Sequence, residues 1–117
     1  MLKTITHFTA VSLISVLPST VHAETKTDNS NVEPGKVHEV CMNLTEGQNL
    51  AYFFKSTKKM NFNIHYHEGE EVTYPVEEYP TNMGSDVFTA PAEQGYCMMW
   101  TNTADEAVDL DVSYEVQ

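Results

Sequence analysis

The sequence predicts an all-β protein, an antiparallel β-sandwich of about seven strands, and two observations lead to this prediction. Apolar and polar residues alternate through most of the chain after residue 36, which is typical of strands with one buried face. Turn-forming residues separate these runs at short intervals, as in Glu46-Gly47, Glu68-Gly69 and Glu93-Gln94-Gly95. Short strands at such spacing, with no run of helical period, indicate a sandwich.

Seven runs carry the alternation, and each is expected to form one strand. They are residues 37–44, 50–55, 60–67, 72–76, 87–90, 96–101 and 108–116. The last run is the clearest, because every second residue from Val108 to Val116 is apolar and the residues between them are polar. The run 72–76 contains Pro75 and lies among glutamates, so we expect it at a sheet edge. The alternative is that the acidic stretch 68–78 forms a recognition surface.

Residues 1–23 predict a cleaved secretory signal. Lys3 precedes an apolar stretch, which ends in Val21-His22-Ala23 with small residues at the positions that a signal peptidase reads. The apolar stretch is too short and too interrupted to span a bilayer. We therefore expect an exported protein, periplasmic or secreted, that begins at Glu24 and has no membrane span after cleavage.

The exported part is acidic. Residues 24–36 are polar apart from Val32 and predict a flexible tether ahead of a single domain over 37–117. From residue 24 onward, 5 lysines oppose 17 Asp and Glu, so the formal charge is 5 − 17 = −12. This charge disfavours nucleic acid and anionic lipid as partners. It leaves cations and basic partners open, although a merely solvated acidic surface is the simpler explanation.

Cys41 and Cys97 predict a structural disulfide, because an even number of cysteines in an exported chain is usually oxidised. Such a bridge would stabilise the domain by roughly 4 kcal/mol in the chain-entropy model. Both cysteines alternate with the more apolar residues of their strands. We therefore expect two neighbouring strands, bridged on the outer side of one sheet or at an edge. A pair of thiolate metal ligands and a redox pair are the alternatives.

His65 and His67 are the candidate metal ligands. They lie two apart in the alternating run 60–67, so their side chains should point to the same side of a strand. Two imidazoles on one face can bind a copper or zinc ion if other strands supply further ligands. The candidates for these further ligands are Glu68, Glu71, Met98 and Met99. The alternative is that the histidines are solvated and the methionines fill gaps in the core.

No enzyme class is favoured by the motifs. Residues 65–71 match the His, His and Glu spacing of the first cupin metal motif, but its flanking glycines are missing and no histidine follows His67. A Gly-x-Ser-x-Gly nucleophile motif is also missing from the sequence. We therefore expect a protein that is not an enzyme and has no certain cofactor, with copper or zinc as the candidates.

A succession of apolar, glycine and aromatic positions covers most of residues 37–117. It comprises Cys41, Leu44, Gly47-Gln48, Tyr52, Phe54, Phe62-Asn63-Ile64, Gly84, Phe88, Gly95-Tyr96 and Trp100-Thr101-Asn102. In this succession the chain resembles the GOLD domain of the p24 (emp24-type) cargo proteins. The resemblance implies a jelly-roll-like sandwich with a Cys41–Cys97 disulfide. It also implies an extracytoplasmic binding module for a protein or small ligand, here without the coiled coil and membrane span of p24 proteins.

Overall fold

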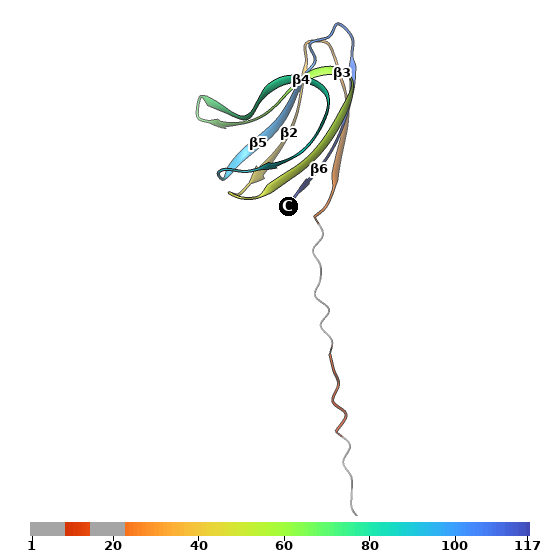
Figure 1. Ribbon diagram of the computed structural model, residues 1–117, viewed down its shortest axis with the longest axis vertical. Helices are drawn as coiled ribbons and strands as arrows, with labels where there is room; N and C mark the ends of the chain where they lie inside the picture. Colours follow the sequence, from red (N-terminus) through yellow and green to blue (C-terminus); the bar gives the residue numbers. More distant parts are fainter. Residues whose placement is uncertain (1–8, 15–22) are drawn as a thin grey trace, which may run out of the picture.

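The computed structural model describes residues 9–14 and 23–117, and its regular structure consists of six strands (Figure 1). These strands are β1 (Lys26–Val32), β2 (Val37–Leu44), β3 (Asn49–Glu68), β4 (Glu71–Thr89), β5 (Gln94–Thr101) and β6 (Val108–Val116). In the described part of the chain, no helix is long and apolar enough to cross a membrane. The predicted signal over residues 1–23 falls mostly outside the described residues and stays a prediction.

The strands form one curled antiparallel sheet that folds over into two layers. Residues 50–56 of β3 pair with β6, whereas residues 61–66 of β3 pair with β5. β1 extends the first layer beyond β6, and β2 extends the second beyond β5. β4 pairs only with β3 and follows it through both layers. Figure 1 shows the resulting curl of β3 and β4 around the remaining strands. The predicted antiparallel all-β fold is confirmed.

Four of the predicted strands join in pairs, and each pair forms one long strand in the structure. Runs 50–55 and 60–67 both belong to β3, and runs 72–76 and 87–90 both belong to β4. The polar residues 56–59 lack glycine and proline, so the chain bends there, with a register shift, instead of ending the strand. Side chains fix this bend, because Ser56 Oγ donates to the Lys58 carbonyl (2.6 Å) and Asp109 N donates to Thr57 Oγ1 (3.0 Å).

The prediction of a flexible tether over residues 24–36 is wrong, because residues 26–32 form β1. This strand pairs with β6 along its whole length, from Lys26 opposite Tyr114 to Val32 opposite Val108. Val32 is buried in the core, and its carbonyl accepts a hydrogen bond from Asn102 Nδ2 (2.9 Å). Polar residues can therefore order here because their backbone groups complete an existing sheet edge, which composition alone does not reveal.

The core lies between the two layers and is rich in aromatic rings. Phe54 of the first layer packs on Phe62 and Trp100 of the second, with ring centroids 4.5 and 5.3 Å apart. Alternation places these side chains on the inner face, as predicted. The fully buried large side chains are Leu44, Leu50, Phe54, Met60, Phe62, Ile64, Tyr96, Met98, Trp100, Val108, Leu110 and Val112.

Gly84 of β4 lies opposite Phe54 of β3, and there is no room for a side chain at position 84. A Cβ at this position would lie 2.4 Å from Phe54 Cε1, and that ring is held by Phe62 and Trp100. We expect Gly84→Ala to lower the free energy of unfolding by about 1–3 kcal/mol, as overpacking typically does. Chemical denaturation measures this loss. Gly95→Ala is the control, because its Cβ would meet only the Asn43 side-chain oxygen, at 3.3 Å. Equal stability of Gly84→Ala and the parent would contradict the packing described.

Candidate functional site

The outer side of the second layer gathers most of the residues that carry chemistry. The pairing register places Cys41, Cys97 and His65 side by side in one row across β2, β5 and β3. The next row holds Glu39, Met99 and Asn63. We call this side of the layer the histidine face, and it consists of Glu39, Cys41, Asn63, His65, His67, Cys97 and Met99.

The disulfide lies within the histidine face. Cys41 and Cys97 are bonded to each other and are direct cross-strand partners of β2 and β5. β2 is the end strand of the sheet path, so the bridge joins neighbouring strands on the outer side at an edge, as the sequence predicts. Since both sulfurs are oxidised, neither cysteine is a thiolate ligand in this structure.

His65 is a buried histidine with two defined neighbours. Its side chain is only 4 % exposed, and Nδ1 lies 2.7 Å from Oδ1 of the fully buried Asn63. Nε2 lies 3.7 Å from Glu39 Oε1. Burial lowers the pKa of His65, an effect that the Glu39 carboxylate opposes and that His67 reinforces. A neutral ring that donates from Nδ1 to Asn63 keeps a free lone pair on Nε2, the nitrogen that lies 3.7 Å from Glu39.

His67 lies on the same side of β3 as His65, as alternation predicts. The two ring centroids are 5.1 Å apart, with the rings nearly perpendicular, and His67 is exposed. Tyr74 of β4 also approaches His65, with the ring centroids 5.7 Å apart. The pair therefore combines a buried imidazole of fixed orientation with an exposed one beside it.

Of the further ligands considered from sequence, the structure brings only Met99 to the histidine face. Met98 is fully buried in the core, on the opposite side of β5. Glu68 accepts a hydrogen bond from Gln94 Nε2 (2.8 Å). Glu71 is the cross-strand pairing partner of Glu68 at the end of the β3–β4 hairpin. Met98 cannot share a site with the histidines, because alternation turns it away from them. For this residue the prediction is corrected.

A cleft of about 550 Å³ adjoins the histidine face where β4 passes alongside it. Its lining residues are Asn63, Val72, Thr73, Tyr74, Glu77, Glu78 and Met99. Asn63 contacts His65 with one end of its amide, whereas the buried Nδ2 at the other end has no hydrogen-bond partner among the described residues. A buried amide end without a partner is uncommon in proteins.

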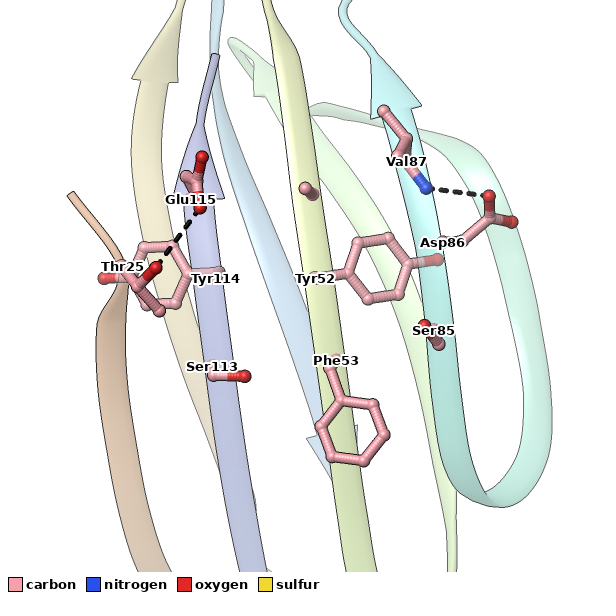
Figure 2. A pocket seen from close by; sticks show the side chains of 10 residues that line it. Thr25, Tyr52, Phe53, Ser85, Asp86, Val87, Ser113, Tyr114 and Glu115 are labelled. Carbon is pink, nitrogen blue, oxygen red and sulfur yellow. Dashed lines mark hydrogen bonds between the residues drawn. The ribbon is translucent and has the colours of Figure 1, made fainter. Parts of the chain in front are cut away.

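A second hollow, of about 340 Å³, lies over β3, β4 and β6 in the first layer (Figure 2). Hydroxyl and carboxylate groups line it, and at its rim Thr25 Oγ1 donates to Glu115 Oε2 (3.2 Å). Burial, with Tyr79 and Asp86 nearby, raises the pKa of Tyr52 to about 12. Its phenol is therefore neutral at physiological pH. No histidine or cysteine lines this hollow, so it offers fewer ligating groups than the histidine face.

Glu39, Asn63 and Tyr74 are site residues that the sequence did not identify. Glu39 lies two residues before Cys41, so it shares a face with a cysteine already placed on the outer side. Asn63 likewise shares a face with His65. These two could have been found from alternation, whereas the approach of Tyr74 depends on the path of β4.

Comparisons with known proteins extend the fold assignment. No family model matches the chain, and no curated protein matches it. Aeromonas hydrophila PliG, a periplasmic lysozyme inhibitor of g-type lysozyme, is a structural neighbour with a TM-score of 0.59 and 14 % identity, over 86 % of this chain and 91 % of that one. The Yersinia pseudotuberculosis-derived mitogen has a TM-score of 0.57 and 13 % identity, over 82 % and 88 % of the two chains.

A third neighbour is the pre-peptidase C-terminal domain of a Bacillus anthracis collagenase. It has a TM-score of 0.51 and 13 % identity, over 80 % of this chain and 89 % of that chain. The three neighbours carry different functions at low identity, so the likeness shows a shared all-β fold and leaves function to the residues of this chain.

Proposed function

We infer that this chain is a small exported binding module of GOLD-like type, acting without catalysis, and that its partner is a basic protein. Export is supported by the signal-like residues 1–23 and by the Cys41–Cys97 disulfide, which forms in oxidising compartments. A binding role is supported by the fold shared with a periplasmic lysozyme inhibitor. Lysozyme is therefore the first partner to test.

The surface of the β3–β4 hairpin is the observation that carries this proposal. Residues 68–80 contain five glutamates and no lysine or arginine. Three large side chains are exposed among them, Val72 at 38 %, Tyr74 at 46 % and Tyr79 at 40 %. Figure 1 shows the green hairpin end projecting from the body of the fold. Exposed tyrosines within a charged surround are typical of protein interfaces, where tyrosine often supplies much of the binding energy.

The charge of the hairpin determines the kind of partner. All five lysines of the exported part, Lys26, Lys36, Lys55, Lys58 and Lys59, lie outside residues 68–80. The hairpin therefore attracts a positively charged surface and repels an acidic one. Pro75 and Pro80 lack backbone N–H groups, so this part of β4 is a poor template for an added strand. Docking through side chains is the mode that the hairpin favours.

Calorimetric titration of g-type lysozyme into residues 24–117, which contain all six strands, tests the proposal together with an assay of cell-wall lysis. We expect binding that weakens as salt rises. Replacing Glu70, Glu71, Glu77 and Glu78 together by glutamine should weaken lysozyme binding by roughly tenfold or more, since several complementary charges are lost at once.

The control replaces four exposed glutamates outside the hairpin by glutamine. These residues are Glu24, Glu33, Glu46 and Glu93. Both variants change the net charge equally, so a specific hairpin contact predicts a much smaller effect for the control. Equal weakening in the two variants would show that only net charge matters. A lack of binding at low salt would remove lysozyme as the partner.

A further inference from the structure

The cleft of about 550 Å³ between the histidine face and β4 has the chemistry of a pocket for a single residue. We propose that it receives an arginine residue of the basic partner, which rests on the binding role proposed above. The guanidinium would meet Glu77, Glu78 and Tyr74, and the peptide carbonyl of the same arginine would accept a hydrogen bond from Asn63.

Asn63 supplies a hydrogen-bond donor that lacks a partner. The residue is fully buried and lines the cleft, and its Oδ1 is already engaged by Nδ1 of His65 at 2.7 Å. Nδ2 has no hydrogen-bond partner among the described residues. An amide nitrogen donates and does not accept, so an oxygen such as a peptide carbonyl satisfies it. Away from water this hydrogen bond is stronger than on an open surface.

The carboxylates of the cleft determine the charge of the ligand. Glu77 and Glu78 are exposed, and no lysine or arginine lines the cleft beside them. None of the ion pairs among the described residues includes either glutamate. A guanidinium offers five N–H donors in one plane, which suits carboxylate oxygens better than the compact ammonium group of lysine does.

Tyr74 provides an aromatic surface in the same cleft. Its side chain is 46 % exposed, so part of the ring is open to a ligand. A guanidinium stacks on such a ring and is attracted to its face. Val72 and Met99 also line the cleft, and they can pack against the methylene groups of an arginine. Met99 is flexible enough to adjust as the carbonyl approaches Asn63.

Two β-bulges in the pairing of β3 with β4 flank this position. In one of them, Glu77 and Glu78 lie between paired residues where β3 has only Asn63. In the next, Tyr74 is one of two β4 residues that oppose a single residue of β3. Extra residues of this kind bend a strand and re-aim its side chains, and they are frequent next to functional sites. The bulges therefore account for a hollow between two paired strands.

NMR titration of N-acetyl-arginine methylamide into nitrogen-labelled residues 24–117 tests the cleft without the whole partner. This arginine probe carries both the guanidinium and the peptide carbonyl. We expect saturable binding with a dissociation constant of about 1 mM, as suits so small a ligand. The side-chain amide signals of Asn63 should be among those that shift.

Two altered probes separate the charge from the carbonyl and leave the protein unchanged. N-acetyl-citrulline methylamide has nearly the same shape without the charge, so it should bind roughly fivefold more weakly or worse. Butylguanidinium keeps the charge but has no carbonyl. It should shift the signals of Tyr74, Glu77 and Glu78 and leave the side-chain amide signals of Asn63 in place.

Two double variants test the carboxylates. Glu77→Gln with Glu78→Gln should weaken binding of the arginine probe by roughly fivefold, because two charges are lost from the cleft. Glu70→Gln with Glu71→Gln changes the net charge equally, but neither residue lines the cleft. It should change the affinity by less than about twofold. The first pair should also weaken lysozyme binding more than the second.

Three results would overturn the arginine pocket: no saturable binding of the arginine probe, side-chain amide signals of Asn63 that do not move at saturation, or equal weakening by the two double variants. Each of them would leave the lysozyme titration to decide the binding role by itself. Binding of the arginine probe by a protein that does not bind lysozyme would support the pocket and remove lysozyme as the partner.

Discussion

Replacing Cys41 and Cys97 together by alanine is expected to lower the free energy of unfolding by about 4 kcal/mol in the chain-entropy model. The bridge connects residues 56 positions apart and so restricts much of the unfolded chain. A single substitution would leave a free thiol next to Glu39, so the double variant is the cleaner test. Denaturant unfolding of both proteins at equal pH measures the difference.

Reduced parent protein is the control for this experiment, because it loses the covalent bond but keeps both side chains. If chain restriction accounts for the stabilisation, the reduced parent and the double variant should unfold at similar denaturant concentrations. A loss below about 1 kcal/mol in both would contradict the expectation from loop length. If the double variant lost much more stability than the reduced parent, the loss would instead be due to the packing of the two side chains.

Alternation predicted the faces of strands well but not their lengths. Phe62 and Ile64 are buried and the cysteines lie on the outer side, as a period of two requires. Alternation predicts a break between strands at the polar residues 56–59, yet β3 bends through them. It does not predict β1, because the order of this strand depends on pairing with β6, at the far end of the chain. Local composition carries no information about such a partner.

The candidate site was predicted in part for the same reason. His65 and His67 follow from local spacing, whereas their closeness to Glu39 depends on β5 lying between β2 and β3. The separation of Met98 from Met99 could have been recognised, since consecutive strand residues point to opposite faces. Only Met99 shares the side of Cys97. Long-range order of strands is thus what the sequence left open.

Tyr74 links the hairpin to the histidine face, because it is exposed on the hairpin and its ring approaches His65. A substitution at Tyr74 would therefore change the hairpin surface and the surroundings of His65 together. Glu70 and Glu71 lie at the hairpin end, and Glu39 lies on β2. Variants at these positions change the hairpin and the histidine face separately.

Phe54→Ala is expected to cost about 3–5 kcal/mol, the range found when a buried phenylalanine is truncated. The ring is fully buried and packs on Phe62 and Trp100, so its removal leaves a cavity where the two layers meet. Phe53→Ala is a matched control, because the neighbouring side chain points outward and is 40 % exposed. It should change stability by less than about 1 kcal/mol.

Thermal and denaturant unfolding of both variants measure this contrast. If Phe54→Ala does not fold, Phe54→Leu replaces it and should lose less stability, because leucine fills part of the cavity. Equal losses at positions 53 and 54 would contradict the assignment of faces on β3. Since β3 carries the core on one side and His65 on the other, that result would also displace the histidine face. The stability contrast is therefore a direct test of the strand geometry on which the histidine face depends.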